Sequence, residues 1–136
     1  MEMKMESNLT LNFKVSEFAC KCGKCSGIPN DSKTINNIKA LASNLQRART
    51  MAGIPFVLNS AYRCQAHNDS LPNSTKDSAH VDGLAVDIAY KDNHQKFLIL
   101  KALFATDFQR IGYSPKKKFI HADLDTDKPN ETFWDY

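Results

Sequence analysis

Two histidines and an aspartate stand at positions from which they could bind a zinc ion. The stretch Ser78–Tyr90, "SAHVDGLAVDIAY", places His80 just before an apolar run and Asp87 within it. His121 lies in a second apolar run, "KFIHADLD". A carboxylate inside an apolar strand is costly unless something pairs with it. Imidazole and carboxylate groups are zinc ligands, and three protein ligands leave a fourth coordination position for a water molecule. Zinc lowers the pKa of this water, so that hydroxide is available at neutral pH.

The alternation of side chains along a strand supports this interpretation. Asp87 shares its face with two alanines, which leave room for a close approach, and His121 shares a polar face with Asp123. The spacing leaves other interpretations open. Each histidine could be a hydrogen-bonded or exposed residue without a metal, and Asp87 could be the ion-pair partner of Arg63.

The elements that must position these residues can be predicted from periodicity and turn formers. The order is helix, strand, strand, helix and hairpin, predicted at residues 31–53, 55–63, 84–90, 92–106 and 108–125. The segment 64–83 reads as a long polar loop, a type that is often functional. The second helix is predicted to bury a stripe of Phe97, Leu100, Leu103 and Phe104. We therefore predict an α+β fold in which helices flank a mainly antiparallel sheet.

Composition limits the classes of protein that remain. The chain has 136 residues, of which 42% are hydrophobic, and a formal charge of +3, so we predict one domain over residues 1–136 and a monomer. The charge is too small to indicate nucleic-acid binding. No signal peptide and no apolar run of transmembrane length are recognised. The expectation is a protein made in the cytoplasm, without stable membrane insertion.

Three motifs resemble the zinc D-alanyl-D-alanine carboxypeptidase family, which includes phage endolysins, vancomycin-resistance dipeptidases and the hedgehog signalling domain. "SAHVDGLAVDIA" is similar to the family signature S-x-H-x-x-G-x-A-x-D. "NSAYRCQAHN" resembles its S-x-Y-R-x-x-x-H-N segment, and "FIHADLD" resembles its closing F-x-H-x-D strand. "VSEFACKCG" and the final "FWDY" are also similar to small phage and bacterial members. The resemblance covers nearly the whole chain.

The resemblance implies a hedgehog/DD-peptidase-like fold and one catalytic zinc ion bound by His80, Asp87 and His121. It implies that Arg63 and Ser78 contact the substrate, with Arg63 polarising the scissile carbonyl or binding a carboxylate. The substrate would be the stem peptide of peptidoglycan, cut at a bond involving a D-amino acid.

One position departs from the family pattern. Several members carry Glu or Asp three residues before the last zinc ligand as the catalytic base, and this chain has Lys118 there. Asp123 is the nearest replacement in sequence. It is a candidate for the base, and the alternative, which we favour, is that it only orients His121.

The cysteines form a second group, "CKCGKC" with Cys64 further along the chain. The irregular C-x-C-x-x-C spacing and a cytoplasmic origin favour free thiols. Disulfides formed after release, and a second, structural ion at Cys20, Cys22, Cys25 and Cys64, stay open as alternatives.

The function predicted from the sequence is zinc-dependent hydrolysis of peptidoglycan, as a carboxypeptidase or an endopeptidase, in phage or prophage cell-wall lysis. The enzyme would act on the wall after release or as part of a virion. Two alternatives remain: a non-catalytic zinc module that binds wall peptide, and an interaction protein built on the cysteines.

Overall fold

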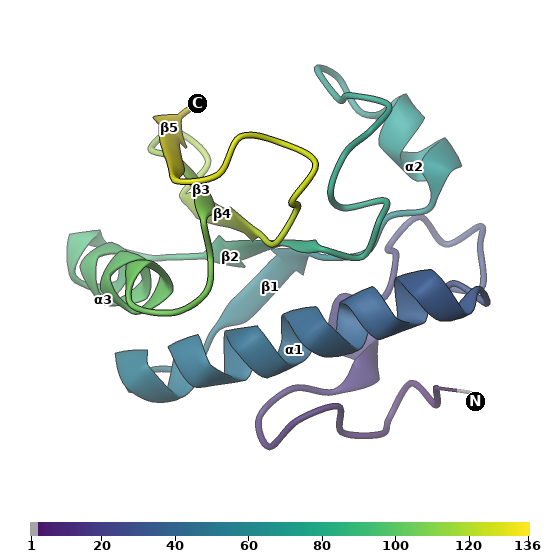
Figure 1. Cartoon of the computed structure of the whole chain (residues 1–136), viewed down its shortest axis with the longest axis horizontal. Coiled ribbons are helices and arrows are strands. Elements are labelled where there is room, and N and C mark those ends of the chain that lie inside the picture. Colours follow the sequence, from purple (N-terminus) through teal and green to yellow (C-terminus); the bar gives the residue numbers. More distant parts are fainter. Residues whose placement is uncertain (1–2) are drawn as a thin grey trace.

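A five-stranded sheet forms the centre of the protein (Figure 1). The computed structural model describes residues 3–136. The strands are β1 (Val57–Ser60), β2 (Ala85–Ala89), β3 (Arg110–Ser114), β4 (Phe119–Asp123) and β5 (Thr132–Asp135). They lie in the order β1-β2-β4-β3-β5, and every pair is antiparallel except β3 with β5. The α+β fold with a mainly antiparallel sheet is therefore confirmed.

Two of the helices cover one face of this sheet, as Figure 1 shows. The helices are η1 (Val15–Phe18), α1 (Ser32–Ala52), α2 (Gln65–Ser70) and α3 (Asn93–Phe104). The long helix α1 begins where the Asp31 carboxylate accepts the backbone N–H of Thr34, and it ends at Gly53 in the left-handed conformation. Helices α1 and α3 pack on the sheet and on each other, while α2 rises on the opposite side.

The core lies between this helical layer and the sheet. Helix α1 contributes Ile38, Leu41 and Leu45, and all three are fully buried. The sheet contributes Val86 and Ile88 from β2, as the alternation predicted. Burying such a side chain contributes about 1.5–3 kcal/mol. The helical face of β2 is therefore fixed by packing, and its other face, which carries the polar residues, is left for a site.

The buried stripe predicted for the second helix is wrong in part. The residues of α3 that are buried are Ile99, Ala102 and Leu103, whereas Phe97 is 62% exposed and Phe104 is 55% exposed. Apolar residues occur on several sides of this helix, so their spacing does not single out one face. Phe104 instead forms an edge-to-face pair with Phe133 of β5, with ring centroids 5.2 Å apart.

The segments on either side of Arg63 also differ from the prediction. The strand predicted at 55–63 ends at Ser60, and Arg63 lies three residues beyond it. The loop predicted at 64–83 contains the short helix α2. Its N-cap is Cys64, whose sulfur accepts the backbone N–H of His67. Cysteine is not among the usual N-cap residues, so the start of this helix could not be recognised from the sequence.

Gly83 stands in the turn between His80 and β2, with φ of +73°. A Cβ at this position would lie 2.8 Å from Cγ1 of Ile38 and 3.1 Å from the carbonyl oxygen of Thr34, both on α1. Strain in the left-handed region and crowding against α1 should add, so Gly83→Ala is expected to lower the free energy of unfolding by about 2–4 kcal/mol.

Gly53 offers a matched control for this prediction. It has the same φ of +73°, but a Cβ there would meet no atom within 4 Å. Gly53→Ala should therefore show only the conformational cost, about 1–2 kcal/mol. Denaturant unfolding of both variants measures the difference. Equal losses of stability would show that the contact of Gly83 with α1 is unimportant.

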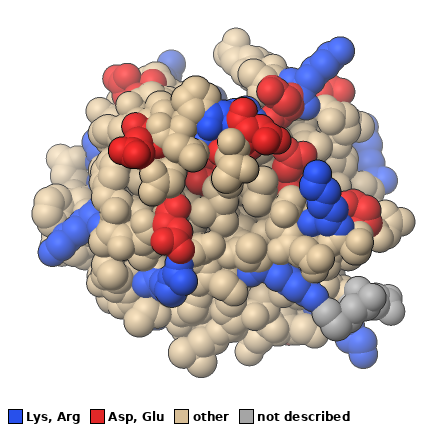
Figure 2. Space-filling view, in the orientation of Figure 1, with Lys and Arg blue, Asp and Glu red and all other residues tan. Residues whose placement is uncertain are grey.

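Charged side chains of both signs are interspersed on the face drawn in Figure 2. This agrees with the small formal charge of +3. Among residues 3–136, no helix combines the length and the apolar character that crossing a membrane requires.

Candidate metal centre

The polar face of the sheet brings the three predicted zinc ligands together. Asp87 on β2 is directly opposite His121 on β4 in the antiparallel register. His80 comes from the loop before β2, where its backbone N–H donates to the Ser78 hydroxyl and its carbonyl accepts the N–H of Arg63. The three side chains are mostly buried.

The ligand atoms are close enough to share one ion. Oδ1 of Asp87 lies 3.3 Å from Nε2 of His80 and 3.0 Å from Nδ1 of His121. One atom from each of the three residues can be chosen so that all lie within 4.8 Å of one another. Zinc bonds of 2.0–2.1 Å in tetrahedral geometry place ligand atoms about 3.3–3.4 Å apart. The arrangement therefore fits a zinc ion.

The remaining nitrogen of each imidazole is held by a second group. Nδ1 of His80 lies 2.7 Å from the carbonyl oxygen of Ala61. Because a carbonyl only accepts, Nδ1 carries the hydrogen and Nε2 keeps its lone pair toward Asp87. Nε2 of His121 lies 2.7 Å from Oδ2 of Asp123, which leaves Nδ1 toward Asp87. Such outer contacts fix the tautomer and orientation of metal-binding histidines.

The charges of the three groups follow from burial and from each other. Burial lowers the pKa of His80, against the attraction of Asp87. Burial acts in the same direction on His121, but the hydrogen bonds with Asp123 and Asp87 outweigh it and raise its pKa to about 9. Burial would raise the pKa of Asp87, yet the two imidazoles hold it well below its usual range. Asp87 is thus ionised and His80 neutral, the forms that bind metal, and His121 releases a proton when it does so.

Asp123 is occupied on both of its oxygens. Oδ2 is bound to His121, while Oδ1 accepts from Nε of Arg110 at 3.1 Å and from the backbone N–H of Asp125 at 3.1 Å. The residue is 1% exposed. The base role of Asp123 stays a prediction, but these contacts favour the alternative in which it orients His121 and balances its charge.

Arg63 lies beside the ligand cluster. Its Nε donates to the Ser60 hydroxyl at 3.2 Å, and one terminal nitrogen donates to Oδ1 of Asn68 at 3.1 Å. The other terminal nitrogen is 3.6 Å from Oδ2 of Asp87, which is an ion pair without a short hydrogen bond. Burial lowers the pKa of Arg63 and Asp87 opposes the change. Two nitrogens are therefore tied to the protein, and the third is turned toward the metal ligands.

A cleft of about 730 Å³ opens over these residues, a size typical of ligand sites. Arg63, Ser78 and the three metal ligands line it. Five cationic side chains line the cleft, and they are Arg63, Arg110, Lys116, Lys117 and Lys128. The carboxylates among its described lining residues are Asp87 and Asp123. The cleft is therefore suited to a substrate that carries carboxylates.

The C-terminal strand contributes an aromatic wall to the cleft. Trp134 of β5 pairs with Gly112 of β3, which in turn lies opposite His121. A Cβ at position 112 would lie 2.4 Å from the indole, so glycine is needed for Trp134 to occupy this place. The indole lies near the His121 ring, with centroids 5.6 Å apart, and Trp134 and Tyr136 both line the cleft.

Other cleft residues were missed for identifiable reasons. Lys116 and Lys117 lie in the turn of the predicted hairpin and border the cleft, and nothing in a run of lysines indicates this. Asn68 is fully buried in α2 and holds Arg63; the "HN" pair in the family-like segment was its only signal. Lys118, at the position of the family base, is exposed in the turn with φ of +55° and does not line the cleft.

The His–Asp–His cluster, with its oriented imidazoles, lies in a cleft beside a buried arginine, and its donor atoms and their spacing fit a zinc ion. The chain belongs to the Peptidase M15 family, because the sequence model of that family matches residues 11–123. The match includes Arg63 and the three predicted zinc ligands. The family is zinc-dependent and acts on peptidoglycan-related substrates. No curated protein matches the chain in sequence.

Proposed function

We propose that the protein hydrolyses a peptide bond of the peptidoglycan stem peptide in which a D-amino acid takes part. Zinc would be held by His80, Asp87 and His121. The observation that carries the proposal is the convergence of these three side chains beside Arg63 in a member of the Peptidase M15 family. We further propose that the protein works as a monomer in phage or prophage lysis, on the wall after release or within a virion.

The bound zinc ion would supply a Lewis acid and a nucleophile at neutral pH. The protein's own residues hold it and orient the substrate. Ala61 and Asp123 fix the two imidazoles, as their contacts indicate. Arg63 directs its free nitrogen to the place beside Asp87 where a substrate carbonyl or carboxylate would lie. Arginine in this position can stabilise the negative charge that develops on the carbonyl oxygen.

The charge of the cleft supports a carboxylate-bearing peptide as substrate. Lys116 and Lys117 lie on its border and form no ion pair among the described residues. Stem peptides end in a carboxylate and carry others along their length, so these lysines would attract them. Ser78 lines the same cleft and is proposed to contact the peptide backbone.

Mass spectrometry of purified peptidoglycan after incubation with the zinc-loaded protein tests this function. New peptide termini should appear in its presence and be absent with a metal chelator. Loss of one terminal D-alanine would indicate a carboxypeptidase, whereas separation of cross-linked peptides would indicate an endopeptidase. Intact peptidoglycan after incubation with correctly folded, zinc-loaded protein would contradict the proposal.

A protein that binds wall peptide without cutting it is the second candidate. One observation favours it: Lys118 replaces the family base, and the described residues lining the cleft include no carboxylate other than Asp87 and Asp123. Retention on insoluble peptidoglycan without new peptide termini would support this candidate.

The role of Asp123 can be tested through Asp123→Asn. If Asp123 orients His121, zinc affinity should fall by about 10–100-fold, and activity should recover in excess zinc. If Asp123 is the base, activity should fall by about 10²–10⁴-fold with zinc still bound. A titration of activity against zinc measures both, and we expect the first result. A rate that stays low in saturating zinc would contradict the orienting role.

Arg110→Gln provides a control for this experiment. It removes the other charged partner of Asp123 and leaves the contact of Asp123 with His121 in place. A much smaller loss of zinc affinity is expected, because the imidazole keeps its acceptor.

A further inference from the structure

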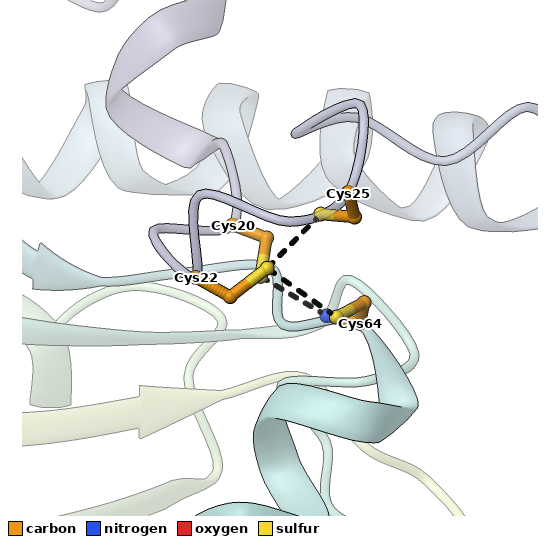
Figure 3. Close-up of side chains that lie close together, drawn as sticks. All are labelled: Cys20, Cys22, Cys25 and Cys64. Atoms are coloured by element: carbon orange, nitrogen blue, oxygen red, sulfur yellow. Dashed lines mark hydrogen bonds between the residues drawn. The ribbon is translucent and has the colours of Figure 1, made fainter.

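A second cluster of potential metal ligands lies outside the cleft. Cys20, Cys22 and Cys25 belong to the loop between η1 and α1, and Cys64 is the N-cap of α2. Figure 3 shows the four side chains turned toward one another from these two segments. Their sulfur atoms all lie within 4.8 Å of one another, and all four are free thiols.

The distances between the sulfurs suit a shared ion. Sγ of Cys22 is 3.5 Å from that of Cys25 and 3.8 Å from that of Cys64. Zinc–sulfur bonds of 2.3 Å in a tetrahedron place neighbouring sulfurs about 3.8 Å apart. The sulfur of Cys22 is about equally close to those of Cys25 and Cys64. A disulfide would need only one such partner, whereas a shared ion needs all of its ligands nearby.

Each of the four sulfurs also accepts a backbone N–H. Lys24 donates to Cys22 and Gly27 donates to Cys25, both at 3.3 Å. The N–H of Cys64 donates to Cys20, and that of His67 donates to Cys64, both at 3.4 Å. Donors directed at sulfur stabilise the negative charge of a thiolate, which is the form that binds metal. The backbone of the two segments therefore supplies one N–H donor to each of the four sulfurs.

We propose that Cys20, Cys22, Cys25 and Cys64 bind a structural zinc ion. Four thiolates fill a tetrahedral site and leave no position for substrate, so this ion would not take part in hydrolysis. It would join the N-terminal loop to the start of α2. Cys64 directly follows Arg63, and α2 carries Asn68, which holds the Arg63 guanidinium. The cysteine site thus stabilises the segment that positions Arg63.

Metal analysis of protein purified under reducing conditions tests the proposal. The wild type should contain two zinc ions, and Cys25→Ser should contain one. His121→Ala should also contain one, and the double variant should contain none. His67→Ala is a control beside Cys64, since His67 is not among the clustered ligand residues, and it should keep both ions.

Cobalt substitution identifies the site that is lost. The cobalt-loaded wild type and His121→Ala should show the near-ultraviolet charge-transfer band of cobalt–thiolate bonds. The band should be weakened in Cys25→Ser. Thermal unfolding should occur several degrees lower in that variant, because a structural ion stabilises the folded state. These readouts do not depend on activity, so they stand even if the proposed hydrolysis fails.

A measurement on the wild type alone covers the case in which a cysteine variant does not fold. Under the proposal, the four thiols react slowly with a thiol reagent until a zinc chelator is added. The proposal is overturned if reduced wild type binds a single zinc that His121→Ala abolishes. It is also overturned if the four thiols react at once without chelator, or if the purified protein has the lower mass of a disulfide-bonded chain.

Discussion

His121→Ala should bind one zinc ion fewer than the wild type and should lose peptidoglycan hydrolysis by at least about 10³-fold. The ring of His121 lies between Asp87 and Asp123, so its removal deletes one ligand and leaves two buried carboxylates without their shared partner. Zinc contributes several kcal/mol of transition-state stabilisation, and each 1.36 kcal/mol corresponds to about a tenfold change in rate. Metal content and digestion of purified peptidoglycan are the two measurements.

His80→Ala should give the same result through a different ligand. His94→Ala is the control, because His94 is exposed in α3 and should leave metal content and rate unchanged. Circular dichroism establishes that each variant is folded. If both ligand variants retain the full zinc content of the wild type, the assignment of this site is wrong.

The convergence of the three predicted zinc ligands could be anticipated because it depends on local rules. Side chains alternate along a strand, so Asp87 lies on the face of its strand that is turned away from the core, whereas Val86 and Ile88 face the core. The same rule places His121 and Asp123 on one face of their strand. The pairing of Asp87 with His121 needed only an antiparallel neighbour, and the structure provides it. The fold class was likewise indicated by the order of the predicted helices and strands.

The surroundings of the ligands could not be anticipated, because they depend on contacts between distant segments. Arg110 reaches Asp123 only through the register of β3 with β4. Trp134 reaches the site because β5 adds in parallel beside Gly112, and the aromatic tail carries no pattern that indicates this. The three N-terminal cysteines are irregularly spaced in the sequence. The fourth, Cys64, is the N-cap of helix α2, which was not predicted from the sequence.

Arg63→Ala should fold and keep its zinc but lose hydrolysis by at least 10²-fold, the scale for removal of one transition-state donor. The side chain is mostly buried, and two of its nitrogens are fixed by Ser60 and Asn68. The third nitrogen, 3.6 Å from Asp87, is the donor free to reach a substrate. Since Arg63 is not a ligand, the loss should appear mainly in kcat.

Arg63→Lys and Asn68→Ala separate the two properties on which this role depends. Lysine keeps the positive charge but cannot bind Ser60, Asn68 and substrate at once, so Arg63→Lys should recover only part of the rate. Asn68→Ala keeps the guanidinium but removes one of its anchors, so its loss of rate should be smaller than that of Arg63→Ala. Zinc content must equal that of the wild type in all three. An Arg63→Ala protein that is fully loaded with metal and as active as the wild type would show that the arginine only neutralises Asp87.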